Sequence, residues 1–351
     1  MSGRDSSVET SIERVELPLD VPFEISRGAM DTTEVVMIRI DDGEHIGVGA
    51  ASPSSYYGED PDSVVAALPD LLSVVEATPD PFAIQRLERE LRATAPEDAA
   101  ARAAVSIAVH DRAAKHLDVP CYQQWGLDPT AAPQTSFSIG IADPETMADR
   151  AAEAVDRGFD RLKLKLGTDD DAGRLGAVRD TVPDATLRVD GNCAWDRETA
   201  LDRIELLEAH DVSLLEQPVA ADDLDALGKV TDATSIPVAA DESCVETSDV
   251  PAVADACDAI VCKLMKCGGI WDAREQIDAA QAHGLEVMLG CMVESNASIT
   301  AGWQLAPLVE RVDLDGSLLL AEDPYAGVAL DHAQPLLGKQ DRPGTGAVRR
   351  P

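Results

Sequence analysis

The stretch Arg161-Leu-Lys-Leu-Lys-Leu166 opens a ladder of charged residues that decides the fold. After Lys165, charged residues recur in steps of 25, 26, 25 and 22 residues, at Asp190, Glu216, Asp241 and Lys263. About 25 residues is the length of one strand–helix unit in a (β/α)₈ barrel, in which about 250 residues make eight units. Each step therefore predicts the C-terminal end of a successive strand, where such barrels carry their chemistry.

The sequence around the ladder has the alternation that a parallel barrel needs. From about residue 134, short apolar stretches alternate with helical stretches that have acidic outer faces. The eight expected strands are Thr135–Ile139, Arg161–Leu166, Thr186–Val189, Ser213–Leu215, Pro237–Ala240, Ala259–Cys262, Glu286–Leu289 and Val312–Leu314. Eight strands alternating with helices indicate an α/β parallel barrel.

The two flanks of the barrel differ from it in pattern. Residues 8–54 are predicted to form strands and residues 61–118 helices, which together indicate an α+β domain. After residue 316 the alternation stops, and we expect the tail to return to the first domain. The predicted domains are residues 1–125, the barrel at 126–322 and a C-terminal segment at 323–351.

The charge is the unusual total of this chain. Asp and Glu number 65 against 29 Lys and Arg, a formal net charge of −36. Binding to nucleic acid needs a basic face, so we expect no nucleic-acid partner. The repulsion between so many carboxylates is screened by salt, and the composition resembles that of a protein from an extreme halophile. An acidic cytosolic protein of ordinary salt tolerance is the alternative.

Other features of the sequence indicate the cellular compartment of the protein. No window approaches 18 uninterrupted apolar residues, so we expect no membrane span. The first residues hold no apolar core, so no signal peptide is expected. The seven cysteines form no CxxC pair, and an odd count argues against a disulfide framework. These features predict a cytoplasmic protein.

The three acids of the ladder are candidate metal ligands. Asp190, Glu216 and Asp241 each follow an expected strand, so their carboxylates should converge at one barrel mouth. Converging buried carboxylates need a cation, and ligation by oxygen alone suits Mg²⁺. The alternative is three unrelated surface acids in an acid-rich chain, but the even spacing favours the metal site.

The lysines of the ladder are candidate bases. Lys163 and Lys165 alternate on one strand and so point to the same face, towards the barrel interior, while the leucines between them face the helices. Lys263 ends the sixth strand, across the barrel from Lys165, and Lys266 is expected outside the pocket. Burial and cationic neighbours lower the pKa of a lysine, which would make it usable as a base. A pair of solvated surface lysines is the alternative.

Two bases on opposite sides of a metal-bound group imply one chemistry. A carboxylate bound to Mg²⁺ makes its α-proton more acidic, because the charge of the enediolate develops beside the metal. One lysine would remove the proton and the other would return one to the opposite face, which inverts the α-carbon. Lys163 would stabilise the extra negative charge.

These residues also carry a family resemblance. The set Lys163-x-Lys165, Asp190-Gly-Asn192, Glu216-Gln-Pro218, Asp241-Glu-Ser243 and Lys263-Leu-Met-Lys266-Cys-Gly-Gly269 resembles the enolase superfamily, in its muconate lactonizing enzyme subgroup. The resemblance covers nearly the whole chain. It implies a modified (β/α)₇β TIM-like barrel with an N-terminal α+β capping domain. It also implies Mg²⁺ on the three acids, with Lys165 and Lys263 as the two acid/base catalysts.

A further match narrows the choice within the subgroup. Asp313-Leu-Asp315 ends the eighth expected strand. In dipeptide epimerases, such as the L-Ala-D/L-Glu epimerases, an Asp-x-Asp at this place binds the α-ammonium group of the substrate, and inward carboxylates suit an ammonium. The alternative is chance, because Asp-x-Asp is common in so acidic a chain. The same resemblance implies four softer substrate contacts, at Ser138, Arg27, Cys291 and Val293, for each of which an ordinary structural role is the alternative. Arg27 is displaced by one residue from the best alignment, and Glu24 lies nearby, which leaves a preference for an acidic side chain open.

The resulting prediction is a Mg²⁺-dependent dipeptide epimerase that works as a homo-oligomer without a membrane partner. The rivals with the same partial reaction are N-acylamino acid racemase, o-succinylbenzoate synthase and muconate cycloisomerase. The synthase and the cycloisomerase would not need an ammonium site. A rival from another class is a Schiff-base aldolase, because buried barrel lysines also form imines. A non-catalytic barrel is the last alternative, and the intact set of lysines and acids argues against it.

Overall fold

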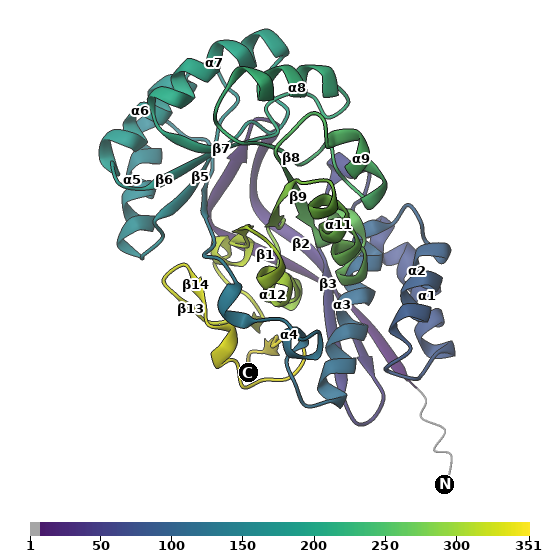
Figure 1. Cartoon of the computed structure of the whole chain (residues 1–351). Helices are drawn as coiled ribbons and strands as arrows, with labels where there is room; N and C mark the ends of the chain where they lie inside the picture. The colour runs from purple at the N-terminus through teal and green to yellow at the C-terminus, as the bar shows by residue number, and fades with distance from the viewer. Residues whose placement is uncertain (1–7) are drawn as a thin grey trace, which may run out of the picture.

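The centre of the molecule is a barrel of parallel strands, seen in a computed structural model that describes residues 8–351 (Figure 1). The strands lie side by side in chain order, as β4 Phe137–Ile139, β5 Arg161–Lys165, β6 Thr186–Asp190, β7 Val212–Glu216, β8 Val238–Ala240, β9 Ala259–Lys263, β10 Glu286–Gly290 and β11 Arg311–Asp313. A parallel bridge between Thr135 and Val312 joins the first strand to the last. The expected barrel is confirmed, and each strand lies within two residues of its predicted bounds.

Helices cover the outside of this barrel. They are α5 Pro144–Asp156, α6 Asp171–Thr181, α7 Arg197–Ala209, α8 Leu224–Ala233, α9 Val250–Val253, α10 Leu264–Cys267, α11 Ile270–Ala282 and α12 Asn296–Leu305. Only a short 3₁₀ turn, Gly316–Leu319, follows β11, which makes the barrel a (β/α)₇β variant. Acidic residues begin several of these helices: Asp143, for example, accepts a hydrogen bond of 3.0 Å from the backbone N–H of Thr146.

The register of the strands places the charged ladder at one level. Lys165 pairs with Asp190, and Asp190 pairs with Glu216. Gly290 pairs with Lys263 on one side and with Asp313 on the other. Because these pairs lie at the carboxyl ends of parallel strands, the ladder becomes a ring of charge around one mouth of the barrel.

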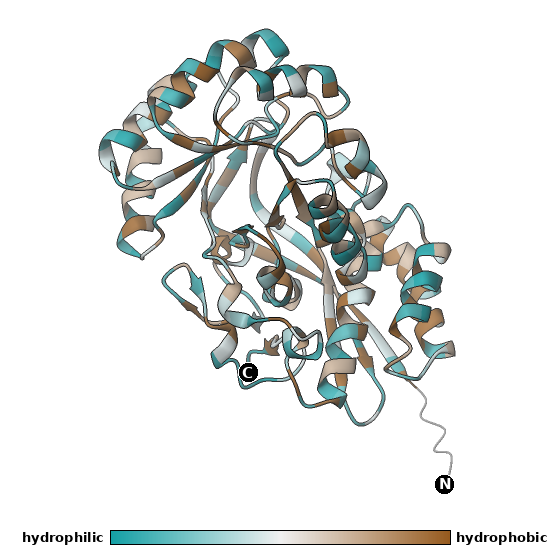
Figure 2. Ribbon diagram, viewed as in Figure 1, coloured by the Kyte–Doolittle hydropathy of each residue, from teal (hydrophilic) through white to brown (hydrophobic). Residues whose placement is uncertain are grey.

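The remaining strand positions hold the core together. Leu162, Leu164 and Leu166 are fully buried against the surrounding helices, so the alternation on β5 is the expected one. Figure 2 shows the consequence, with brown strands inside and outer helices that alternate between teal and brown faces. Inside the barrel, a separate apolar cluster of Leu214, Ala239, Ala259, Val261 and Met288 fills the floor.

An N-terminal unit covers part of the barrel. It consists of an antiparallel sheet, β1 Glu9–Ile25, β2 Gly28–Asp41 and β3 Ile46–Ala51, and the helices α1 Pro61–Ala77, α2 Ile84–Thr94 and α3 Ala99–His116, followed by the short α4 Cys121–Gln124. Helix α2 begins three residues after Pro81. Strand β3 lies so close to α3 that a Cβ on Gly49 would stand 2.1 Å from the carbonyl oxygen of Ala104. We call this unit the cap.

The C-terminal segment lies against the cap. It contains β12 Tyr325–Ala326, β13 Leu330–Asp331, β14 Gln334–Pro335 and β15 Val348–Arg349. Tyr325 and Ala347 pack in one cluster with residues of the cap sheet, and the N–H of Thr345 donates to the buried Asp111 of α3 at 2.8 Å.

Three expectations concern the chain as a whole. Residues 1–7, which belong to the predicted first domain and to the stretch without a signal peptide, lie outside the described residues. Within residues 8–351, no helix combines the length and apolar character that crossing a membrane needs. All seven cysteines are free.

Candidate active site

A cavity of about 270 Å³ opens at the mouth of the barrel, under the cap. The cap contributes residues from the turn between β1 and β2 and from the loop Ser52–Tyr57. The barrel contributes Lys163, Lys165, Lys263, Asp313 and Asp315. Of the softer candidates, Ser138, Cys291 and Val293 come from the barrel, and Arg27 comes from the cap. The three acids Asp190, Glu216 and Asp241 are buried behind this lining. All twelve candidates thus gather at one site.

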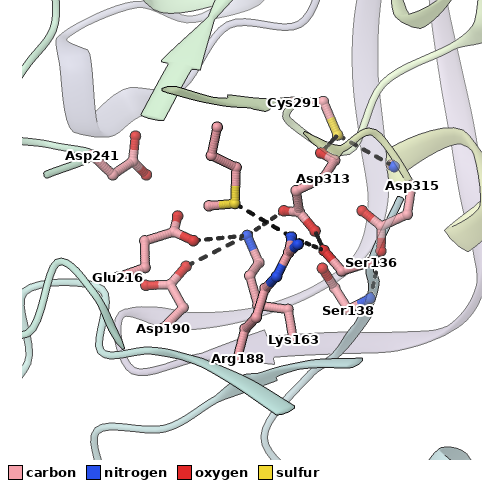
Figure 3. Close-up of polar contacts among 12 residues, drawn as sticks. Ser136, Ser138, Lys163, Arg188, Asp190, Glu216, Asp241, Cys291, Asp313 and Asp315 are labelled. Atoms are coloured by element: carbon pink, nitrogen blue, oxygen red, sulfur yellow. Dashed lines mark hydrogen bonds and ion pairs between the residues drawn. The ribbon is translucent and has the colours of Figure 1, made fainter. Parts of the chain in front are cut away.

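Each of the three acids contacts a lysine. The Nζ atom of Lys165 lies 2.5 Å from Oδ2 of Asp190, and that of Lys263 lies 2.7 Å from Oδ2 of Asp241. The Nζ atom of Lys163 lies 3.3 Å from Oε2 of Glu216. Figure 3 shows Lys163 between Asp190 and Glu216 on one side and Asp313 on the other. We call the group of three acids the carboxylate cluster.

These contacts determine how the groups titrate. Burial alone would lower the pKa of Lys263, but the neighbouring Asp241 raises it above its ordinary value. Lys163 behaves in the same way, because Asp313 and Glu216 outweigh the effect of burial on its pKa. The expectation that burial would leave these two lysines with lowered pKa values is therefore wrong for this state of the site. Carboxylates, not cations, are their nearest charged neighbours.

The carboxylates titrate unequally. Burial and the nearby Asp190 raise the pKa of Glu216 to about 8. Burial would also raise the pKa of Asp190 and Asp241, but Lys165 lowers the first, and Lys263 and Lys266 lower the second. Glu216 is the member of the cluster with the least compensated charge.

The donor set fits a hard divalent cation. Oε1 of Glu216 is buried and has no hydrogen-bond partner, which is a costly state for a carboxylate that a cation would relieve. Three carboxylates, whose donor atoms are all oxygen, suit Mg²⁺. Within residues 8–351 no three acidic, histidine or cysteine side chains already stand in a metal-binding arrangement. The contacts explain this, since each acid of the cluster turns towards a lysine.

Two residues hold Asp241 from behind. The Nζ atom of Lys266, fully buried, lies 2.6 Å from Oδ1 of Asp241 and also donates to the carbonyls of Asp241, Cys244 and Val261. The side-chain oxygen of Gln217 accepts from the N–H of Asp241 at 2.9 Å. Lys266 lies outside the cavity lining, as the sequence had predicted, yet it contacts the carboxylate cluster directly. Its position three residues after Lys263 in the quoted motif was the available signal.

The opposite side of the cavity carries the Asp-x-Asp pair. Asp313 contacts Lys163 and the hydroxyl of Ser136, and Lys163 lowers the pKa that burial would raise. Asp315 accepts from the backbone N–H of Ser138 at 2.5 Å and forms no ion pair with any Lys, Arg or His of the described residues. Burial and the charge of Asp313 raise the pKa of Asp315 to about 6. We call Asp315 and its surroundings the ammonium side.

A buried arginine closes the barrel beneath the site. Nη1 of Arg188 donates to the hydroxyl of Ser136 at 3.2 Å and to the carbonyl of Val312 at 3.1 Å, and it lies 3.5 Å from Sδ of Met288 (Figure 3). Sequence reasoning missed both polar residues. The alternation rule could have found them, since Arg188 lies two residues before Asp190, and Ser136 two residues before Ser138, on inward-facing positions.

The softer candidates are held by the protein itself. Sγ of Cys291 donates to the carbonyl of Asp313 at 3.3 Å, and burial raises the pKa of this thiol. The carbonyl of Val293 accepts from two cap hydroxyls, those of Thr33 at 3.2 Å and Ser52 at 3.0 Å. Ser138 presents its backbone N–H to Asp315. These contacts show structural roles, and contact with a substrate stays a prediction for each.

Comparison with known proteins agrees with this geometry. The model of the enolase C-terminal domain-like family matches residues 146–350, and that of the mandelate racemase / muconate lactonizing enzyme N-terminal domain matches residues 7–126. The chain belongs to the enolase superfamily.

Relatives of this enolase-superfamily chain include several epimerases. It is 37% identical to the L-Ala-D/L-Glu epimerase of Bacteroides thetaiotaomicron, over 95% of this chain and 86% of the relative. A solved structure of the dipeptide epimerase of Enterococcus faecalis, complexed with Mg and L-Leu-L-Tyr, superposes with a TM-score of 0.91 at 31% identity and covers 97% of this chain and 99% of that one. The N-succinyl Arg/Lys racemase of Bacillus cereus is also similar, with a TM-score of 0.88 at 28% identity, covering 98% and 95% of the two chains. The resemblance read from the motifs is confirmed at the level of family and fold.

Proposed function

We propose that this protein is a Mg²⁺-dependent dipeptide epimerase. The observation that carries the proposal is the arrangement of two lysines and two charged ends in one cavity. Lys165 on β5 and Lys263 on β9 stand four strands apart in the eight-stranded barrel, on opposite sides of the mouth. The carboxylate cluster and the ammonium side stand on the remaining two sides. A dipeptide has a carboxylate and an ammonium group at its two ends, which match these two sides.

The lysines carry out the proton transfer in this proposal. The amine of one lysine takes the α-proton as the C–H bond breaks, and the ammonium of the other gives a proton to the opposite face as the new C–H bond forms. The net change is inversion of the α-carbon, with no oxidant or other reactant. In the reverse direction the two lysines exchange roles. Lys163, whose Nζ contacts Glu216 and Asp313, lies where it would stabilise negative charge on the substrate.

Asp190, Glu216 and Asp241 would hold the metal. Bound there, Mg²⁺ would supply positive charge beside the substrate carboxylate, as a Lewis acid. Lys266 and Gln217 keep Asp241 in place from behind, at 2.6 and 2.9 Å. The cap closes the cavity from above and excludes water from the proton transfer, which prevents loss of the transferred proton to solvent.

Asp315 distinguishes a dipeptide from the substrates of the rival enzymes. It is a buried carboxylate at the cavity surface that forms no ion pair with a basic side chain of residues 8–351, and a substrate ammonium would supply a direct partner. An N-acylated amino acid or a muconate has no α-ammonium group. The Schiff-base aldolase explains neither the carboxylate cluster nor Asp315.

The test is deuterium incorporation into dipeptides. The protein is incubated in D₂O with Mg²⁺ and a set of dipeptides, in parallel with N-succinyl amino acids, and the products are analysed by mass spectrometry and chiral chromatography. We expect exchange and epimerisation at the α-carbon that bears the free carboxylate, lost on addition of EDTA and recovered with Mg²⁺. Exchange of N-succinyl amino acids but of no dipeptide would favour the rival racemase. A borohydride-trapped adduct at Lys165 or Lys263, with activity insensitive to EDTA, would favour the aldolase.

A further inference from the structure

The apolar lining of the cavity comes largely from the cap. Phe23, Ile25 and Met30, near the turn between β1 and β2, line it together with Leu319 from the turn after β11. Among residues 8–351, Arg27 is the one basic residue that the cap contributes to this lining. A free arginine here would attract an acidic side chain, so its partners decide which substrates the cap favours.

Arg27 is already engaged by the barrel. Its Nη1 atom lies 2.9 Å from Oε1 of Glu242 and donates to the carbonyl of Asn192 at 2.8 Å. Its guanidinium carbon lies 4.4 Å from the centroid of the Tyr56 ring, within the range of a cation–π contact. The contacts with Glu242 and Asn192 hold the tip of the cap to the mouth of the barrel, and the contact with Tyr56 lies within the cap.

Glu242 depends on this contact. Its side chain is 1% exposed, and Arg27 is the basic residue that forms an ion pair with it among residues 8–351. Its second oxygen, Oε2, is buried and has no hydrogen-bond partner. Withdrawing Arg27 to bind a substrate carboxylate would leave Glu242 as an unpaired buried charge, which is strongly unfavourable. Arg27 is therefore a poor receptor for an acidic substrate.

The geometry of the proposed reaction shows which part of the substrate meets the cap. Lys165 and Lys263 define one axis across the mouth, from β5 to β9, along which the α-proton leaves and returns. The carboxylate cluster and Asp315 define a second axis, from β6–β8 to β11, that crosses the first. The fourth substituent of the α-carbon, its side chain, must then point along the barrel axis. Arg188 and Met288 fill the floor, so the side chain points towards the cap.

We propose that the epimerised residue has an apolar side chain that packs against Phe23, Ile25 and Met30, with Arg27 committed to Glu242 as a latch on the cap. This inference rests on the proposed function and names its substrate class more closely. An acidic residue at the epimerised position would meet an apolar wall and an arginine whose charge is already used.

The test compares two substrates that differ at one side chain. We expect kcat/KM for L-Ala-L-Leu to exceed that for L-Ala-L-Glu by at least about 10-fold, the range in which apolar pockets discriminate. In Arg27→Met, the ratio of kcat/KM for L-Ala-L-Leu to kcat/KM for L-Ala-L-Glu should not rise, because Arg27 does not bind the glutamate side chain. In Glu242→Gln, which releases the guanidinium of Arg27, this ratio should fall, because the free guanidinium would favour L-Ala-L-Glu.

Two other results would distinguish a wrong assignment of Arg27 from a wrong proposed function. A wild-type preference for L-Ala-L-Glu, together with a selective loss of that substrate in Arg27→Met, would overturn the latch while leaving the epimerase intact. Absence of exchange with every dipeptide would instead overturn the proposed function. Arg27→Met remains decisive even where Glu242→Gln fails to fold.

Discussion

The two charged sides of the cavity balance their buried carboxylates in different ways. On the side of β6–β8, Asp190, Glu216 and Asp241 each contact a lysine of the protein. On the side of β11, Asp313 contacts Lys163, whereas Asp315 accepts a hydrogen bond from Ser138 and forms no ion pair with a basic side chain of residues 8–351. The first side can remain folded with its own counter-ions, and the second leaves a negative charge for a ligand to neutralise. The difference teaches that a metal ion must compete with lysines for the carboxylate cluster, whereas a substrate ammonium group has no such competitor at Asp315.

The lysines are the part of this comparison where substitution should have the largest effect. Lys165→Met and Lys263→Met each remove one partner in the proton transfer and should lower the rate of epimerisation by about 10²–10⁴-fold. Each variant should retain deuterium exchange from only one of the two substrate epimers, because the remaining lysine faces one side of the α-carbon. Mass spectrometry of each pure epimer in D₂O measures this.

The exposed Lys229 of α8 provides a control for the loss of a lysine charge. Lys229→Met should epimerise at the wild-type rate. Equal loss of exchange from both epimers in Lys165→Met and in Lys263→Met would contradict the assignment of the two lysines to opposite faces.

Lys266 tests how the protein holds the carboxylate cluster in place for a metal ion. Its Nζ atom holds Oδ1 of Asp241 while Lys263 holds Oδ2. Lys266→Met should weaken Mg²⁺ binding by about 10–100-fold, as expected when a residue that orients a metal ligand is lost. Isothermal titration calorimetry without substrate measures the affinity directly.

Val261→Ala is the matched control for this variant. It removes packing inside the same strand, β9, without touching the side chain of Asp241, so it should lower the melting temperature and leave the Mg²⁺ affinity unchanged. Wild-type affinity in Lys266→Met would show that Lys266 only stabilises the barrel.

The same contrast explains what the sequence could predict. The positions of Asp190, Glu216 and Asp241 follow from spacing, because a barrel repeats its strand–helix unit and its chemistry stands at the strand ends. The raised pKa of Lys263 could not be predicted in this way, since it depends on the 2.7 Å contact with Asp241. Distances between side chains are set by packing and by rotamers, which spacing does not encode.

The residues that position others were the hardest to predict. Gln217 belongs to a quoted motif, but its hydrogen bonds to Asp241 and Ser243 cross from one strand end to the next. The pairing of Arg27 with Glu242 joins residues 215 positions apart. Sequence reasoning found Arg27 as a candidate substrate contact, and only the structure shows its partner.

Substitutions of the two acids on the ammonium side should both lower the activity but change the melting temperature in opposite directions. Asp315→Asn removes a buried, unpaired charge, so it should raise the melting temperature, while kcat/KM for dipeptides falls by about 10–100-fold through loss of a charged hydrogen bond. Asp313→Asn should also lower kcat/KM for dipeptides, but it should lower the melting temperature, because it deprives the buried Lys163 of a partner. Differential scanning calorimetry and steady-state kinetics test both. Loss of stability in both variants would show that Asp315 is also compensated in the free protein.

The smallest expected effect is the pH dependence of substrate binding on this side. Burial and Asp313 raise the pKa of Asp315 from its ordinary value of 3.8 to about 6. The folded protein therefore binds this proton more tightly than the unfolded chain, and the contribution of Asp315 to stability decreases as the pH rises from about 4 to about 6. Binding of the ammonium needs the ionised carboxylate, so KM for dipeptides should rise as the pH falls through about 6. In Asp315→Asn, KM should not rise as the pH falls through about 6. A rise that persists in this variant would assign the titration to another group.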